Sequence, residues 1–368
     1  MDALRKRRPG VRFLLTTGTV TSAALARERL NHQDLHQYAP LDAPVYIKRF
    51  LDHWKPDLVA LTESEIWPNT IMTCHLRGIP MALVNARISE RSFKRWRKNR
   101  TSSRPLFSRI RLILAQNERL ARRLRELGGR DVVIAGNLKV DAPPLPVDQA
   151  GLAALKSEVG TRPVFLAAST HPGEDEIVFE TLARLKAAIP DLLLVLAPRH
   201  PARGGPICDM AKAAGFSSAR RSLSQRITSE TDVYVADTVG EMGIFYSLAQ
   251  IAFIGGTLVD RGGQNPIEPG RFNVAVLAGP SRFNFADAYE ELSRRGAVID
   301  VCDAKQLAQE VAILLAEPTV RAQLIMKAAA GLEAMVGALD VTADALAALL
   351  ADTEHALRPA DEGLKRAS

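Results

Sequence analysis

One stretch constrains this chain more than any other. Residues 255–269 read Gly-Gly-Thr-Leu-Val-Asp-Arg-Gly-Gly-Gln-Asn-Pro-Ile-Glu-Pro and follow the apolar run 251–254, which predicts a buried strand. Glycine lets backbone N–H groups approach a ligand closely, and a turn between a strand and a helix presents such groups to an anion. Gln264, Asn265 and Glu268 add amides and a carboxylate that suit ribose hydroxyls. A plain turn explains the glycines alone, whereas the combination predicts a phosphosugar or nucleotide pocket.

Apolar runs alternate with amphipathic helical stretches along the rest of the chain, which is typical of βαβ wiring and a parallel sheet covered on both faces. The predicted strands are 11–17, 58–62, 81–85, 112–116, 132–135, 164–168, 192–197, 233–236, 251–254, 274–278 and 297–301. The clearest predicted helices are 22–30, 45–53, 68–77, 118–127, 174–188, 307–315 and 322–350. The expected fold class is α/β, with two Rossmann-like parallel-sheet domains facing a cleft.

A proline-rich break divides the chain. Three prolines in four residues at 143–146 cannot continue a helix or a central strand, so we expect a linker there. The expected segments are an N-terminal domain at 1–142, a linker at 143–150, a C-terminal domain at 151–330, a helical segment at 331–352 that could pack back on the N-terminal domain, and a polar tail at 353–368.

The charge of the chain is unevenly distributed. Residues 1–150 hold 27 Lys and Arg against 14 Asp and Glu, whereas residues 151–368 hold 21 against 27. The basic half should attract an anionic partner such as lipid head groups, a phosphorylated substrate or nucleic acid. Three scattered cysteines suggest a reducing compartment, and the sequence shows no continuous apolar run near 18 residues.

Polar motifs directly follow the predicted strands, where open α/β sheets bind their ligands. In the second half, Ser169 and Thr170 precede a helix that either could cap. Arg199 lies between two prolines, which favours a preorganised phosphate contact, and His200 follows it. Residues 237–242 place a glycine beside a helix start.

The first half carries three comparable motifs. Glu63 and Glu65 could accept hydrogen bonds from substrate hydroxyls or take part in proton transfer, although Glu65 could equally complement a helix dipole. Arg87 and Arg91 offer guanidiniums to phosphate or carboxylate. Lys139 ends the last strand before the linker and should point into the cleft.

Residues 90–111 contain nine Lys and Arg interleaved with Phe93, Trp96 and Phe107. Exposed aromatic rings among cations are costly unless a partner covers them. Anionic lipid and single-stranded nucleic acid both meet that requirement, and this segment does not distinguish them. A solvated basic helix is the simpler alternative.

Taken together, these motifs occur in the same order in the lipid A Kdo transferases, the 3-deoxy-D-manno-octulosonic acid (Kdo) transferases, which the chain resembles from about Val11 to about Leu350. The matching segments are 62–68, 85–91, 136–139, 168–170, 198–201, 240–242 and 255–269. The resemblance implies the two-domain GT-B glycosyltransferase fold, no cofactor and no metal. It implies inverting transfer of Kdo from CMP-Kdo to a lipid A precursor in lipopolysaccharide synthesis, at the anionic cytoplasmic face of the inner membrane, with no nucleic-acid partner.

The resemblance also implies roles for individual residues. The donor-binding residues would be Arg199, His200, Gly240, Glu241, Met242, Asn265 and Glu268, with Ser169, Thr170 and Lys139 near the donor's anionic groups. The acceptor side would comprise Glu63, Glu65, Arg87, Ser89 and Arg91.

The N-terminus departs from the family pattern. Members begin with an apolar anchor and a first strand that ends in His-Ala-x-Ser-x-Gly-Glu, whose glutamate is taken as the general base, and this sequence begins at Met1–Arg8 instead. We therefore expect an N-terminal domain without its first strand, a peripheral form without the anchor, and impaired activity. The favoured explanation is a truncated chain or a late start codon.

Three alternatives to an active transferase remain at this point. The first is a non-catalytic protein that binds glycolipid or membrane on the same fold. The second is an RNA-binding protein that acts through residues 90–111. The third is a nucleotide-sugar epimerase, because one fold hosts many functions.

Overall fold

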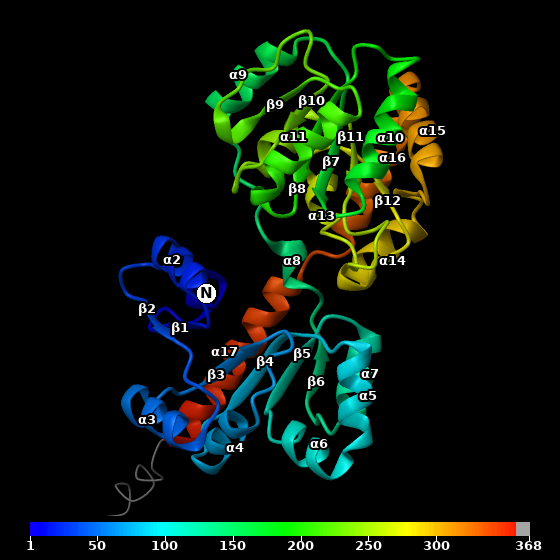
Figure 1. Cartoon of the computed structure of the whole chain (residues 1–368). Helices are drawn as coiled ribbons and strands as arrows, with labels where there is room; N and C mark the ends of the chain where they lie inside the picture. The colour runs from blue at the N-terminus through cyan, green and yellow to red at the C-terminus, as the bar shows by residue number, and fades with distance from the viewer. Residues whose placement is uncertain (358–368) are drawn as a thin grey trace, which may run out of the picture. The chain divides into compact units, whose positions relative to one another are not determined.

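The computed structural model describes residues 1–357, with side chains to Asp352, and divides into two compact units. The first unit comprises Met1–Asp141 together with the chain from Met335 onward, and the second comprises Ala142–Ala334. Each unit has its own parallel sheet with helices packed against it (Figure 1). The predicted α/β class is confirmed.

The second unit is built on seven parallel strands in the order β13-β12-β11-β7-β8-β10-β9. Their bounds are β7 Val164–Thr170, β8 Leu193–Pro198, β9 Ser218–Arg220, β10 Val233–Val235, β11 Ile251–Ile254, β12 Ala275–Ala278 and β13 Val298–Asp300. The helices between them are α9 Gln149–Val159, α10 Asp175–Lys186, α11 Gly204–Ala213, α12 Met242–Leu248, α13 Ile267–Arg271, α14 Ala286–Arg294, α15 Ala304–Ala316 and α16 Pro318–Glu333, with 3₁₀ turns at Pro201–Arg203, Arg221–Leu223 and Phe283–Phe285.

The order of these strands creates a topological switch point. The chain runs from β7 to β8, then to the edge strand β9 and back to β10 between them, and finally returns to place β11 on the other side of β7. Loops that follow two such neighbouring strands leave in opposite directions, which opens a crevice at their carboxyl ends. The β7 and β11 ends carry Thr170 and Gly255, so the glycine-rich stretch starts at the switch point.

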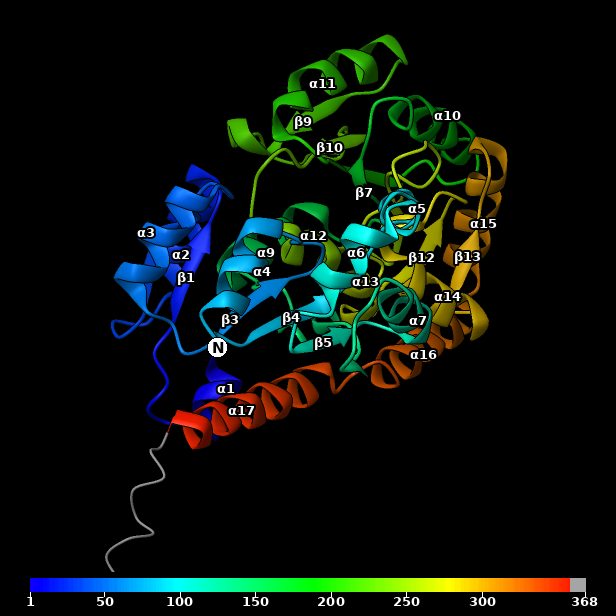
Figure 2. The same ribbon diagram turned by 90° about the horizontal axis from the view of Figure 1, so that it is seen from below.

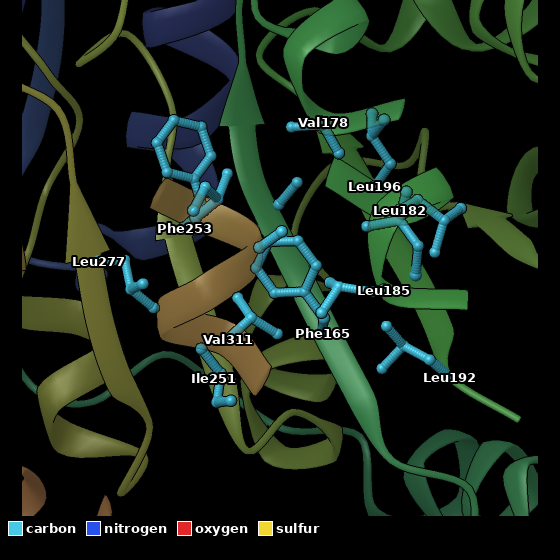
Figure 3. Packing of buried hydrophobic residues seen from close by; sticks show 14 of the residues in the cluster. Phe165, Val178, Leu182, Leu185, Leu192, Leu196, Ile251, Phe253, Leu277 and Val311 are labelled. Carbon is cyan, nitrogen blue, oxygen red and sulfur yellow. The ribbon is translucent and has the colours of Figure 1, made fainter. Parts of the chain in front are cut away.

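Alternate apolar residues of this sheet pack under α10, α11 and α15 (Figure 3). Phe165 and Phe253 from the central strands meet Leu182 of α10 and Val311 of α15, and all four are at most 1% exposed. The aliphatic runs of the strands therefore form one continuous core, which fixes the positions of the strand ends.

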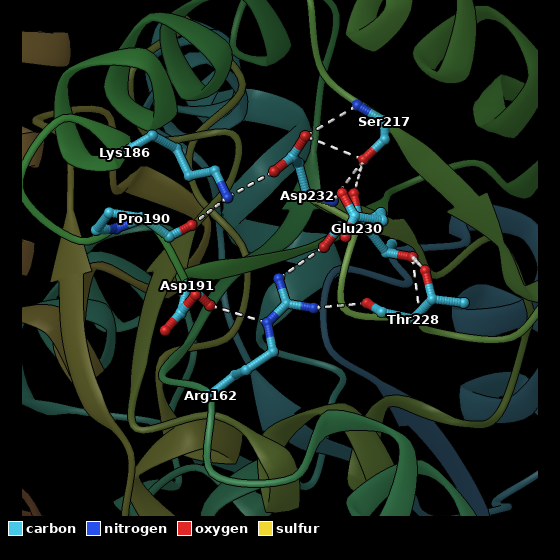
Figure 4. Close-up of polar contacts among 9 residues, drawn as sticks. Arg162, Lys186, Pro190, Asp191, Ser217, Thr228, Glu230 and Asp232 are labelled. Carbon is cyan, nitrogen blue, oxygen red and sulfur yellow. Dashed lines mark hydrogen bonds and ion pairs between the residues drawn. The ribbon is translucent and has the colours of Figure 1, made fainter.

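The amino-terminal edge of the sheet is held by polar contacts (Figure 4). Arg162 precedes β7 and donates to the carbonyl oxygens of Asp191, Thr228 and Thr231 at 2.6–2.9 Å. Lys186 forms an ion pair with Asp232 at 2.5 Å. These contacts stabilise the loops on the edge opposite to the switch point.

The first unit contains a four-stranded parallel sheet in the order β3-β4-β5-β6, with bounds Val59–Thr62, Met81–Ala86, Leu112–Ala115 and Val132–Ile134. Its helices are α1 Asp2–Arg7, α2 Val20–Arg29, α3 Pro44–Trp54, α4 Pro68–Leu76, α5 Glu90–Lys98, α6 Arg100–Phe107, α7 Glu118–Glu126, α8 Leu138–Asp141 and α17 Ala338–Leu357. The two faces of β4 belong to different cores. Met81 and Leu83 pack with residues of α3–α7, whereas Ala82 and Val84 pack with Leu346 of α17. Figure 2 shows α17 lying along this sheet beside α1.

A separate pair of strands stands apart from that sheet. The predicted strand at 11–17 forms β1 (Leu14–Thr17), but it pairs in parallel with β2 (Leu35–Tyr38) rather than with the main sheet. The strand β2 is absent from the predicted strands, because its short, exposed segment gives little periodicity.

The predicted helix at 322–350 is two helices, because α16 ends at Glu333 and α17 begins at Ala338. Asp141 stabilises the new start by accepting from the backbone N–H groups of Gly337 and Leu339. Arg7 of α1 pairs with Asp340 and Asp344 on α17.

By length and composition, Pro318–Asp352 could cross a membrane, which differs from the expectation of no such run. It spans the break between α16 and α17, and 28% of its most apolar window is buried. One stretch of this kind is weak evidence of a span. Residues 358–368 of the predicted tail lie outside the described residues.

Candidate functional site

A buried carboxylate occupies the switch point of the second unit. Glu174 lies in the turn after β7, is fully buried, and accepts from four backbone N–H groups. The distances are 2.6 Å from Gly256, 3.0 Å from Thr257, 3.0 Å from Leu258 and 2.9 Å from His171. A buried charge is tolerated only when it is fully hydrogen-bonded, as this one is. Glu174 therefore ties the turn after β7 to the glycine-rich loop after β11.

The expectation that this loop offers its N–H groups to a bound anion is wrong for most of the loop. Glu174 takes the first three groups, Gly262 donates to Ser281 Oγ at 3.0 Å, and Gly263 donates to the Gly256 carbonyl at 2.8 Å. The glycines serve a different purpose. A Cβ at Gly255 would lie 2.3 Å from the Ser169 carbonyl oxygen, so glycine permits the two strand ends to approach each other.

The end of β7 is distorted, and its residues do not cap the helix α10 that follows. Ser169 has a positive φ of 59°, and the pairing of β7 with β8 shifts register between Ala168 and Thr170. Thr170 is buried and donates to Asp175 at 2.7 Å. Neither Ser169 nor Thr170 caps α10, so that prediction is wrong. Arg203 completes the cluster by pairing with Asp175 and donating to the Thr170 carbonyl at 2.9 Å.

Positive charge gathers around His171. Its ring lies 3.2 Å from the Gln264 amide nitrogen and 6.4 Å, between centroids, from His200. Burial lowers the pKa of His171, and the nearby charges of Arg261, His200, Arg199 and Arg203 lower it further. The imidazole is therefore held neutral and can donate or accept a hydrogen bond while the guanidiniums carry the charge.

Asn265 and Glu268 lie together at the start of α13. The Asn265 amide donates to Glu268 at 3.1 Å, and its carbonyl oxygen accepts from the Ile267 N–H at 3.1 Å. Burial raises the pKa of Glu268 above its usual value of 4.5, which the Asn265 hydrogen bond and Arg271 partly offset. A half-buried carboxylate with acceptor capacity left over is suited to a pair of sugar hydroxyls.

The β10 loop places Gly240, Glu241 and Met242 at the same edge of the sheet. Gly240 has φ of 89° and is exposed, and Met242 opens α12. The Glu241 carboxylate accepts from Arg221 at 2.5 Å and from Thr238, and these bonds lower its pKa. Glu241 therefore holds the turn in place, while Gly240 and Met242 remain accessible.

In the first unit, Glu63, Arg87 and Lys139 form one ionic cluster. Glu63 has a positive φ of 55°, and its two oxygens lie 2.8 Å from Lys139 Nζ and 3.0 Å from Arg87 Nε. Lys139 thus contacts a residue predicted for the acceptor side rather than a donor-side residue. Asn85, also at positive φ, accepts from the Leu138 N–H at 3.1 Å and so positions α8 beside β4.

The remaining predicted acceptor residues are exposed and separate from that cluster. Glu65 accepts from the Trp67 indole N–H at 2.5 Å. Ser89 caps α5 by accepting from the Ser92 N–H at 3.2 Å, so its hydroxyl has a structural role. The Arg91 guanidinium has no hydrogen bond or ion pair to any residue from 1 to 352.

The aromatic residues of segment 90–111 are not exposed as expected. Phe93 and Phe107 are buried in the core of the first unit, and half-buried Trp96 packs edge-on against Phe107 at 5.8 Å. Arg97 and Arg123 lie over the Phe93 ring at 5.4 and 5.0 Å. The argument that these rings need a lipid or nucleic-acid partner is therefore wrong, and only the basic outer face of α5 remains.

Three residues of the site were not singled out from the sequence. Glu174 is the first residue of the predicted helix 174–188, Arg261 lies within the stretch 255–269, and His171 lies between the predicted strand 164–168 and that helix. Glu174 lies four residues after the distorted end of β7, and this position was the available signal. A carboxylate beside a switch point can accept hydrogen bonds from the backbone N–H groups of the facing loop.

We expect Glu174→Gln to loosen the glycine-rich loop. The amide NH₂ group cannot accept, so two of the four N–H donors lose their acceptor at a cost of roughly 1–3 kcal/mol each. Hydrogen exchange measured over residues 251–264 should accelerate by about tenfold or more.

The matched control is Glu176→Gln, because Glu176 is exposed at the start of the same helix. It should exchange like the unmodified protein. Equal exchange in both variants would contradict the role given to Glu174.

Comparison with known proteins places this geometry in context. The family model for 3-deoxy-D-manno-octulosonic-acid transferase (kdotransferase) matches residues 1–142. The 3-deoxy-D-manno-octulosonic acid transferase of Rickettsia felis is 35% identical over 312 residues, which is 85% of this chain and 67% of that protein. The transferase of the same name from Bordetella pertussis is 35% identical over 346 residues, covering 92% and 81%.

Among solved structures, a glycosyltransferase from Rickettsia africae superposes with a TM-score of 0.60 at 11% identity, covering 94% of this chain and 98% of that one. At that identity the likeness shows the fold alone, and it confirms the predicted GT-B architecture. The sequence relationships go further: this chain belongs to the family of 3-deoxy-D-manno-octulosonic acid transferases.

Proposed function

We propose that this chain transfers Kdo from CMP-Kdo to a hydroxyl of a lipid A precursor, with inversion, in lipopolysaccharide synthesis. The observation that carries the proposal is the 35% identity to Kdo transferases, which extends over 346 residues for the Bordetella pertussis relative and so spans both units. The proposal assigns a role in substrate binding to the polar clusters of each unit.

The second unit supplies the donor site in this proposal. Arg199 would meet the phosphate of CMP, Glu268 and Asn265 the ribose hydroxyls, and Gly240 with Met242 the remaining face of the nucleotide. All five residues follow β8, β10 or β11 in the chain, so they lie at one edge of a single parallel sheet. That edge is where open α/β sheets bind nucleotides.

Bond cleavage in this reaction leaves negative charge on the departing CMP phosphate. Preorganised cations stabilise such charge as it develops, without reorganisation during the step. Arg199 is exposed and follows β8, and its backbone N–H is fixed by a 3.0 Å hydrogen bond to the Thr170 carbonyl. The Arg199 side chain therefore starts from a fixed point of the backbone, and in this proposal it meets the phosphate on which the charge develops.

The first unit supplies the acceptor side. Arg91 offers a guanidinium to a phosphorylated glycolipid, and the Glu63–Arg87–Lys139 cluster offers a fixed carboxylate and two cations. The basic face of α5, with exposed Arg91, Lys94, Arg95 and Lys98, suits the anionic cytoplasmic surface of the inner membrane.

The donor assignment predicts that CMP binds and that two substitutions weaken it. Arg199→Ala and Glu268→Ala should each raise the Kd for CMP by about 10- to 100-fold, the usual cost of losing a hydrogen bond to a charged group. Isothermal titration calorimetry measures this directly.

Arg226→Ala is the matched control, since Arg226 is 80% exposed and pairs with Glu158 at 2.8 Å in the same unit. It should bind CMP normally. Unchanged affinity in the Arg199 and Glu268 variants would remove the donor site from the second unit.

The membrane assignment predicts binding to vesicles that contain anionic lipid. Arg91→Glu combined with Arg95→Glu should reduce cosedimentation by about tenfold, because each basic residue near an anionic surface contributes about 1 kcal/mol and each reversal adds repulsion. Raising the salt concentration should have the same effect.

Arg184→Glu together with Arg226→Glu makes the same change of charge on the second unit and should leave vesicle binding intact. Equal loss in the two double variants would show that net charge, not the face of α5, determines the binding.

A further inference from the structure

Two exposed guanidiniums lie near His171, those of Arg199 and Arg261. Arg199 follows β8, Arg261 lies in the glycine-rich loop after β11, and both side chains are exposed. Among residues 1–352, whose side chains the structure describes, neither guanidinium makes a hydrogen bond or an ion pair. Two carboxylates beside them are already engaged, since Glu174 is held by four N–H groups and Asp175 by Thr170 and Arg203. These carboxylates therefore do not neutralise the two guanidiniums by ion pairs, which leaves both able to bind an anionic ligand.

Arg261 is also held in place by its backbone. Its N–H donates to the Val259 carbonyl at 2.7 Å, and its carbonyl oxygen accepts from the Asn284 side chain at 2.8 Å. The surroundings of Gly256 show how close His171 and Arg261 lie to each other. A Cβ there would lie 3.2 Å from the His171 ring and 3.5 Å from Arg261 Cβ. His171 and Arg261 therefore flank one glycine and lie close to each other.

The chemistry of the proposed donor matches two cations at one site. In an octulosonic acid the carboxyl group is bonded to the carbon that carries the nucleotide phosphate in the activated sugar. The donor therefore presents two anionic groups attached to the same carbon. A single guanidinium can bind one of them in bidentate fashion, and the second group then needs its own partner.

We propose that Arg261 binds the carboxylate of the sugar acid while Arg199 binds the phosphate, with the His171 imidazole between them. This inference rests on the proposed function and assigns Arg261 as a residue that selects an acidic sugar. Arg199 receives the phosphate because it lies on the β8 side, next to β10 and its Gly240–Met242 turn. Arg261 lies on the β11 side of His171.

The test compares three ligands and three variants by calorimetry. Arg261→Ala should weaken binding of CMP-Kdo by about tenfold or more, and binding of CMP by less than about threefold, because CMP has no carboxylate. Arg199→Ala should weaken both ligands. Arg226→Ala should weaken neither. A donor analogue with a carboxamide in place of the carboxylate should bind equally to the unmodified protein and to Arg261→Ala.

Each outcome decides a different question. Equal weakening of CMP and CMP-Kdo in Arg261→Ala would make Arg261 a phosphate ligand and overturn the inference. No weakening of either would overturn it as well while leaving the donor site intact. Failure of the unmodified protein to bind CMP would overturn the proposed function itself. An unchanged unfolding temperature for Arg261→Ala, which we expect for an exposed side chain, excludes a folding defect as the cause.

Discussion

The carboxylate of Glu174 organises the second unit. It joins the turn after β7 to the loop after β11, which are the two segments that leave the sheet in opposite directions. A switch point without such a connection would leave the donors of the glycine-rich loop unsatisfied and the loop free to move. A protein carboxylate therefore occupies the place that a glycine-rich turn commonly offers to phosphate.

Because Glu174 occupies the backbone N–H groups of the loop, an anion here must be bound by side chains instead. Arg199, Arg261 and the His171 imidazole lie beside the filled amide nest, and the carboxylates of Glu174 and Asp175 are already engaged. Guanidiniums impose direction as well as charge, so a site of this type can discriminate between ligands that carry one or two anionic groups. The fixed scaffold and the free cations are consequences of the same buried carboxylate.

The strand pattern, the residues at the strand ends and the α/β class could be predicted, because apolar runs and polar motifs are local in sequence. The contacts of Glu174 with the glycine-rich loop could not be predicted, since its partners there are 82–84 residues away. The burial of Phe93 and Phe107 was missed for a similar reason. Basic residues on the outer face of a helix make the whole segment look exposed, although its other face packs into a core. The break between α16 and α17 depends on Asp141, nearly 200 residues distant.

A crystal structure of the protein with bound CMP tests this account most directly. We predict that the Glu174 carboxylate stays on the N–H groups of Gly256, Thr257 and Leu258, and that the phosphate lies against Arg199. A phosphate seated on those three N–H groups, with Glu174 displaced, would contradict it.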